Sequence, residues 1–212
     1  MKIVANGCSH VHEGHFKESD RWTFKLQIEN IALRGSSNAN IFHTTLEYLN
    51  KNTPGTLLIG WTSFDRYSMT HKSDQNVHIT PHQVLTDSNE YTDYSISQYY
   101  YKNLHSKFLN LKNFFIYYTH LEKYCTAKNI KFLNFCAGVS FNDSLGGLKV
   151  EQKEYLNEQV YNLKPVNWIE HKIGYSYWND LVLQNNFPLW HDGHAGLEAS
   201  HKWYQIVKEN LN

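Results

Sequence analysis

Two short segments near opposite ends of the chain carry side chains that could perform acyl transfer together. Ser9 follows an apolar run at residues 3–6 that predicts a strand, so its hydroxyl would emerge where that strand ends. His194 precedes a stretch with helical spacing, residues 197–211, and Asp192 lies two positions before it. A serine hydroxyl is a weak nucleophile until a histidine accepts its proton, and the histidine needs an acid or carbonyl oxygen to fix its tautomer. We therefore predict Ser9 as nucleophile, His194 as base, and Asp192 or a backbone carbonyl as the group that orients the base.

The same chemistry needs hydrogen-bond donors for the negative charge that develops on the substrate's carbonyl oxygen. The turn-like run Arg34-Gly35-Ser36-Ser37-Asn38 precedes a predicted helix and offers such donors. We predict the backbone amides of Ser9 and Gly35, with the side-chain amide of Asn38, for this task. Each residue also has a structural interpretation: Ser9 closes a turn, Gly35 supplies a positive φ, and Asn38 caps the helix.

The elements expected around these residues alternate between strand and helix. Strands are predicted at residues 3–6, 56–61 and 130–135, and helices at 20–32, 38–49, 95–128, 151–161, 176–184 and 197–211. This order favours a parallel sheet with crossover helices. We predict an α/β fold, a three-layer α/β/α sandwich with a central parallel sheet of about five strands and flavodoxin-like layering. Ligands in such sheets bind outside the carboxyl ends of the strands, where Ser9, Thr62 and Cys136 would emerge.

Length and charge narrow the class of protein. The 212 residues are expected to form one domain, with irregular insertions near 62–93 and 137–165. Basic and acidic residues balance at 20 each and no basic run stands out, so no nucleic-acid partner is expected. The sequence has no signal-like start and no long apolar stretch, and its three cysteines have unrelated spacings. We therefore expect a cytoplasmic protein without a membrane partner.

Four segments, in this order, resemble the sequence blocks of the SGNH (GDSL-type) hydrolases. More narrowly, they are similar to a group of SGNH-like proteins from bacteriophages and marine bacteria, which implies a phage-encoded protein expressed in the host cytoplasm. The segments are Asn6-Gly7-Cys8-Ser9, Gly35-Ser36-Ser37-Asn38, Gly60-Trp61-Thr62-Ser63 with Arg66, and Asp192-Gly193-His194-Ala195-Gly196-Leu197-Glu198-Ala199.

The resemblance implies an esterase that works through a Ser9 acyl-enzyme, with His194 as base and no cofactor or metal. Thr62 and Ser63 fall where the family's third block binds the substrate and the oxyanion. Aromatic residues make up 15% of the chain, which favours a glycan ester, above all an O-acetylated carbohydrate, over other small-molecule esters.

Two departures from the family pattern leave other hypotheses open. Thr62 and Ser63 replace the third-block Asn, and the last block is Asp-x-His, with His191 at the position three before His194. An inactive SGNH-like domain that binds a ligand or assembles into a virion is therefore the alternative function. A metal-dependent enzyme is the third hypothesis, because six histidines form two groups at the two ends of the chain: His10, His12, His15, His191, His194 and His201.

Overall fold

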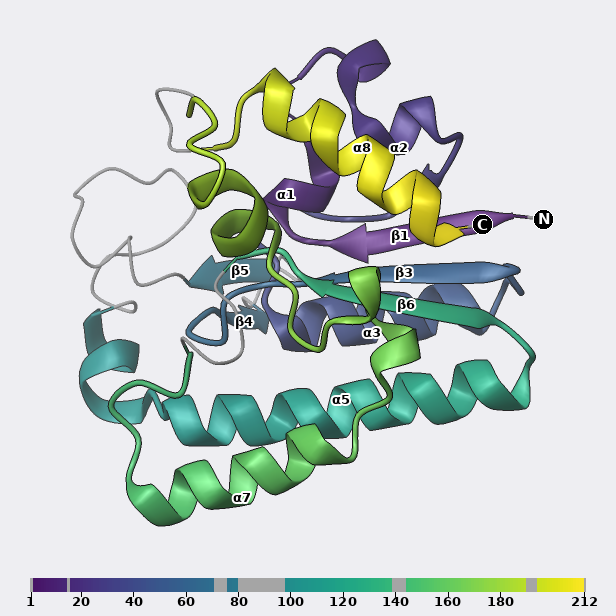
Figure 1. Cartoon of the computed structure of the whole chain (residues 1–212). Helices are drawn as coiled ribbons and strands as arrows, with labels where there is room; N and C mark the ends of the chain where they lie inside the picture. Colours follow the sequence, from purple (N-terminus) through teal and green to yellow (C-terminus); the bar gives the residue numbers. More distant parts are fainter. Residues whose placement is uncertain are drawn as a thin grey trace.

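The structure is a computed structural model that describes residues 2–14, 16–70, 76–79, 98–138, 144–189 and 194–211, without the side chains of 68–70, 76–79 and 179. Its centre is a four-stranded parallel sheet in the order β2-β1-β3-β6 (Figure 1). The strands of this sheet are β1 (Ile3–Gly7), β2 (Glu29–Asn30), β3 (Thr56–Trp61) and β6 (Lys131–Cys136). A separate antiparallel hairpin consists of β4 (Tyr67–Thr70) and β5 (Asn76–Ile79).

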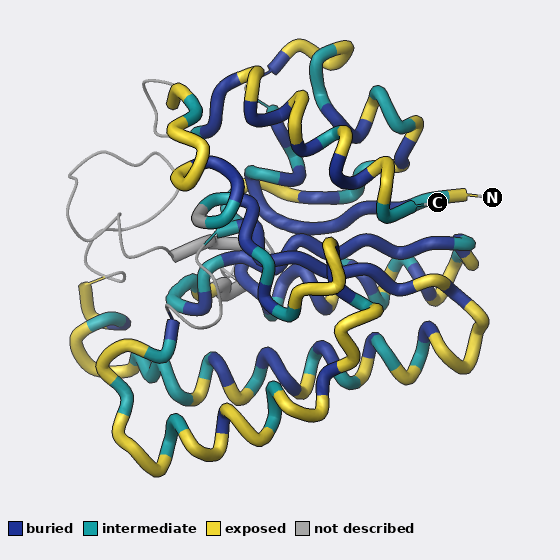
Figure 2. Tube along the Cα trace, viewed as in Figure 1, coloured by how far each residue is buried: buried dark blue, intermediate teal, exposed yellow. Residues whose placement is uncertain are grey.

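The central strands are buried on both faces, as a parallel sheet covered by helices requires. Every residue of β3 is buried, and so are five of the six residues of β6 (Figure 2). In the register of β1 and β3, Gly7 lies beside Gly60, so both strands end at the same edge of the sheet. The residues that follow these strands therefore emerge together at that edge.

Helices cover both faces of the sheet (Figure 1). One layer contains α3 (Asn38–Leu49) and α5 (Lys107–Ala127), with α7 (Val150–Tyr161) packed on α5. The other layer contains α1 (Ser9–His12), α2 (Trp22–Lys25) and α8 (Leu197–Leu211). The short helical segments are η1 (Glu18–Asp20), η3 (Tyr100–Leu104), η4 (Pro165–Asn167), η5 (Ile169–His171) and η6 (Tyr177–Leu183). These layers confirm the predicted α/β/α fold class, and none of the described helices is long and apolar enough to cross a membrane.

The predicted helix at 20–32 is wrong beyond its first turn. Only Trp22–Lys25 is helical, Gln27 has a left-handed φ of 53°, and Glu29–Asn30 pairs with β1 as the edge strand β2. The alternating apolar residues of this segment are compatible with a short strand as well as with a helix. The segment forms a strand because its backbone can pair with the edge of β1.

The edge of the sheet beyond β6 explains why four strands are seen where about five were expected. Trp168 and Ser176 form isolated parallel bridges with Asn134 and Cys136, so this segment runs beside β6. It is not a continuous strand, because Glu170 and His171 within it have positive φ values of 57° and 52°. Left-handed residues interrupt the extended backbone that a strand needs.

Candidate active site

Ser9 begins α1 directly beyond the carboxyl end of β1, and only 8% of its surface is exposed. The close approach of α1 to the sheet depends on two neighbouring glycines. A Cβ atom on Gly7 would lie 2.4 Å from Cγ2 of Val11, and one on Gly60 would lie 2.5 Å from the same atom. Val11 therefore sits over the two glycines and fixes α1, and with it Ser9, at the edge of the sheet.

His194 lies beside His10, the residue that follows Ser9. The two imidazole ring centroids are 5.3 Å apart, and His10 also packs against Tyr177 and Trp178 at 5.7 and 5.6 Å. Both histidines are half-buried. The fold thus brings the predicted base next to the segment that carries the predicted nucleophile, from opposite ends of the chain. Asp192 and His191 lie outside the described residues, so the group that orients His194 stays a prediction.

The predicted oxyanion donors belong to the turn before α3. Gly35 has a φ of 76°, which meets the expectation of a turn residue, and the hydroxyl of Ser37 caps α3 by accepting from the Asn40 amide at 3.3 Å. Asn38 is the first residue of α3. Its Nδ2 donates to the carbonyl of Thr62 at 3.2 Å, and its Oδ1 accepts from the amide of Thr62 at 2.9 Å.

The Asn38–Thr62 pair holds the start of α3 against the end of β3. A carboxamide has two N–H donors, and this pair uses one of them. Thr62 is buried, whereas Ser63 is half-buried and accepts from the Asp65 amide at 3.4 Å. Within the part of the chain that the structure describes, no contact is seen for the second Asn38 donor.

Comparisons with known proteins identify the fold. No protein-family model matches the chain, and no curated protein matches its sequence. Among solved structures, it is similar to the psychrotrophic esterase EstA from Pseudoalteromonas sp., in a structure inhibited by monoethylphosphonate, with a TM-score of 0.54, 10% identity, and 99% of this chain and 96% of that one covered. A GDSL-like lipase from Bacteroides thetaiotaomicron matches with a TM-score of 0.53 at 12% identity, over 98% of this chain and 86% of the lipase. The acetyl xylan esterase AlAXEase matches with a TM-score of 0.51 at 10% identity, over 100% of both chains. The chain has the SGNH hydrolase fold.

One residue of this SGNH fold that the sequence did not single out is Glu13. Its side chain is 1% exposed, and its carboxyl group accepts from the Trp22 amide at 2.8 Å and from the Ser200 hydroxyl at 2.7 Å. Burial raises the pKa of Glu13 to about 8, although these hydrogen bonds and the positive charges of Arg21 and Lys25 oppose the shift. Glu13 therefore joins the segment after Ser9 to α2 and to α8. Nothing in the local sequence predicts this, because the burial comes from residues far along the chain.

The histidine groups are only partly brought together. His12 lies against Gly14, and burial, together with Arg21 and Arg34, lowers the pKa of His12. His201 is exposed on α8, while His15 and His191 lie outside the described residues. Among the residues that the structure describes, no group of three or more His, Cys, Asp or Glu side chains is placed to hold a metal ion.

Proposed function

We propose that this protein is a serine-dependent acyl-ester hydrolase that removes acyl groups, above all acetyl, from carbohydrates. The observation that carries the proposal is the contact between His194 and His10, since it joins the predicted base to the residue after the predicted nucleophile. This contact lies at the carboxyl edge of the parallel sheet, the place where α/β proteins bind ligands. The SGNH fold of the chain supports the same reaction class.

The reaction proceeds through two displacements. His194 accepts the Ser9 proton as the hydroxyl oxygen attacks the ester carbonyl, and it then donates that proton to the leaving alcohol as the C–O bond breaks. Water next loses a proton to His194 and attacks the acyl-enzyme, which releases the acid and restores the Ser9 hydroxyl. Asp192 orients the imidazole during both steps.

The oxyanion is stabilised at the start of α3 and of α1. The backbone amides of Ser9 and Gly35 donate to it, together with the Nδ2 hydrogen of Asn38 that Thr62 does not use. Asn38 thereby supplies the amide that the third block lacks, where Thr62 and Ser63 stand. Removal of one such donor typically slows the reaction by about a hundredfold or more.

Aromatic rings beside the base support a carbohydrate substrate. His10 contacts His194, the buried Tyr177 and the half-buried Trp178, so Trp178 is the accessible aromatic ring of this group. Sugar rings stack on such faces while their hydroxyls bond to polar neighbours. The acetyl xylan esterase among the similar structures is consistent with an acetylated glycan.

Acetate release tests the proposal. Wild-type protein should release acetate from acetylated xylo-oligosaccharides and hydrolyse p-nitrophenyl acetate, and Ser9→Ala should abolish both activities. Ser19→Ala changes an exposed serine nearby in the chain and should keep them. Equal activity in wild type and Ser9→Ala would overturn the proposed nucleophile.

The second candidate function is an inactive SGNH-like binding protein. Thr62 and Ser63 at the third block favour it, because the family's oxyanion donor is missing there. A folded wild-type protein with no esterase activity on either substrate would favour this candidate over the hydrolase.

A further inference from the structure

A small cavity lies between the first turn of α3, the segment after β3 and one face of α5. Its volume is about 60 Å³, and its lining includes Asn38, Arg66, Tyr67, Asn113 and Tyr117. One water needs roughly 10–15 Å³ of such space, so the cavity can hold a carboxylate or a phosphate group but not a sugar ring. Asn38 belongs both to this cavity and to the candidate oxyanion site.

Arg66 brings a buried hydrogen-bond donor to this cavity. Its Nη1 atom is buried and has no hydrogen-bond partner within the part of the chain that the structure describes. A guanidinium stays charged at any ordinary pH, and a buried donor without a partner costs free energy. A ligand with negatively charged oxygens would remove this cost and match the planar donor fork.

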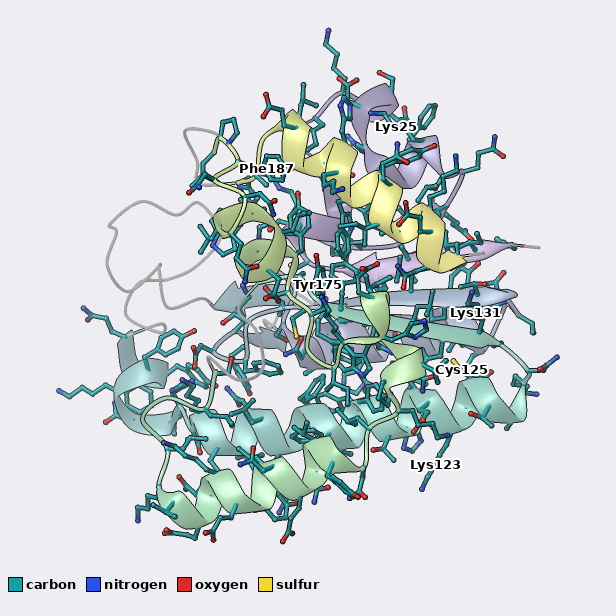
Figure 3. All side chains as sticks on the ribbon, in the orientation of Figure 1. Lys25, Lys123, Cys125, Lys131, Tyr175 and Phe187 are labelled. Atoms are coloured by element: carbon teal, nitrogen blue, oxygen red, sulfur yellow. The ribbon has the colours of Figure 1, made fainter. Side chains whose placement is uncertain are left out.

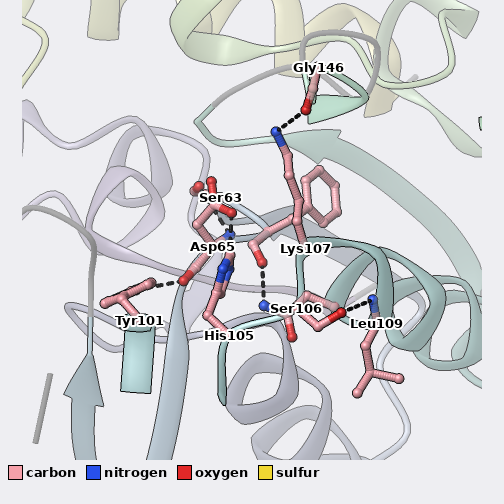
Figure 4. Close-up of polar contacts among 10 residues, drawn as sticks. Ser63, Asp65, Tyr101, His105, Ser106, Lys107, Leu109 and Gly146 are labelled. Atoms are coloured by element: carbon pink, nitrogen blue, oxygen red, sulfur yellow. Dashed lines mark hydrogen bonds and ion pairs between the residues drawn. The ribbon is translucent and has the colours of Figure 1, made fainter. Parts of the chain in front are cut away.

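Among the described residues, no ion pair joins Arg66 to the neighbouring carboxylate of Asp65. Oδ1 of Asp65 lies 3.2 Å from Nε2 of His105, and the hydroxyl of Tyr101 donates to the Asp65 carbonyl at 2.6 Å (Figure 4). The Asp65 carboxylate therefore lies beside His105 without a hydrogen bond to it, and only the Asp65 main chain is bonded to the segment before α5. The N-terminus of α3 forms another wall of the cavity, and its dipole adds to the preference for an anion.

The remaining lining suits a saccharide that carries the anion. Asn110 and Asn113 lie on one face of α5, and Nδ2 of Asn110 donates to the carbonyl of Phe64 at 2.8 Å, which fixes the segment before Arg66. Tyr67 stacks on Tyr100 with a centroid distance of 4.5 Å and is 39% exposed. A sugar ring outside the cavity can pack on this exposed aromatic face.

We propose that this cavity binds a carboxylate or phosphate group of the substrate, with Arg66 as its main ligand. The substrate class is therefore an acyl ester of an acidic sugar. This inference rests on the esterase function proposed above and narrows its specificity.

Binding of unreactive sugars tests the cavity without turnover. Ser9→Ala protein is titrated with D-glucuronate, glucose 6-phosphate and glucose, and the dissociation constants are measured by calorimetry. At least one of the two anionic sugars should bind about tenfold more tightly than glucose. Comparing the affinities for D-glucuronate and glucose 6-phosphate shows whether the cavity prefers a carboxylate or a phosphate. Adding Arg66→Gln should remove the preference. Adding Lys123→Gln should keep it, because Lys123 is exposed on α5 away from the cavity (Figure 3).

Arg66→Lys provides a second variant that keeps the charge but loses the planar fork, and part of the preference should survive in it. Equal affinities for the three sugars in folded protein, or an unchanged preference in Arg66→Gln, would overturn the inference. An anion preference in a protein whose wild type hydrolyses no ester would support the cavity and count only against the esterase function.

Discussion

The imidazole of His10 packs against that of His194, with ring centroids 5.3 Å apart and planes tilted by 51°. This contact connects the start of the chain to the segment before α8. Because His10 also contacts Tyr177 and Trp178, its ring is held in place next to the predicted base.

His10→Ala should lower kcat by about tenfold or more, because a base displaced by a fraction of an ångström loses its alignment with Ser9. His10→Phe restores a ring of similar size and should recover most of the activity. The measurement is kcat and KM on p-nitrophenyl acetate for both variants. Wild-type kcat in His10→Ala would show that the ring does not position His194.

Ser9→Ala and His194→Ala should each reduce turnover by about a thousandfold or more, since nucleophile and base act as one unit. Neither change empties a core position, so the free energy of unfolding should change by less than about 1 kcal/mol. Activity assays and urea unfolding on the same preparations separate the two effects. A loss of several kcal/mol would instead identify the residue as structural.

Glu13 should make folding stability fall as pH rises. Its pKa is about 8 in the folded chain against an ordinary 4.5, so between these values the folded state keeps a proton that the unfolded chain releases. The stabilising effect of the bound proton is complete below pH 4.5 and is lost as the pH passes 8, with a slope of up to about 1.4 kcal/mol per pH unit. Glu13→Gln should remove this slope and keep two hydrogen bonds, because its amide oxygen can accept from the Trp22 amide while its Nε2 donates to the Ser200 hydroxyl oxygen.

Urea unfolding of wild type and Glu13→Gln at pH 5, 6.5 and 8 checks this prediction. The difference between the two proteins isolates Glu13, because all other titrating groups are common to both. If the difference in free energy of unfolding between wild type and Glu13→Gln did not change with pH, the prediction for Glu13 would be wrong.

Gly60→Ala should destabilise the fold by about 1–3 kcal/mol, because the new methyl group would overlap the side chains of Val11 and Phe135. Adding Val11→Ala removes one of the two contacts. The double variant should therefore lose less stability than the sum of the single variants, as measured by thermal unfolding. Additive losses would contradict the packing of Val11 over this glycine.

Local sequence was enough to predict those elements whose boundaries depend on their own residues. The helix at 38–49 and the helix at 197–211 have the predicted ends, because apolar spacing sets both and Ser37 caps the first. The segment at 20–32 was misjudged because an unpaired strand edge elsewhere in the chain determines its structure.

The candidate site was predictable only in part. A strand that ends before Ser9 placed it at the sheet edge, yet the contact of His194 with His10 depends on how the chain returns to that edge before α8. Arg66 belongs to the third block of the resemblance, but the sequence assigns no binding role to it. Only the fold shows that the buried Nη1 of Arg66 lacks a hydrogen-bond partner among the described residues, while the Asp65 carboxylate lies beside His105.

The central claim is that Ser9 is an activated nucleophile, and covalent labelling tests it without a known substrate. Wild type, Ser9→Ala and His194→Ala are treated with a small fluorophosphonate, and the intact mass of each is measured. We predict a single adduct on wild type that maps to Ser9, and no adduct on either variant. Folded wild-type protein that remains unlabelled, or an adduct that persists in Ser9→Ala, would contradict the account.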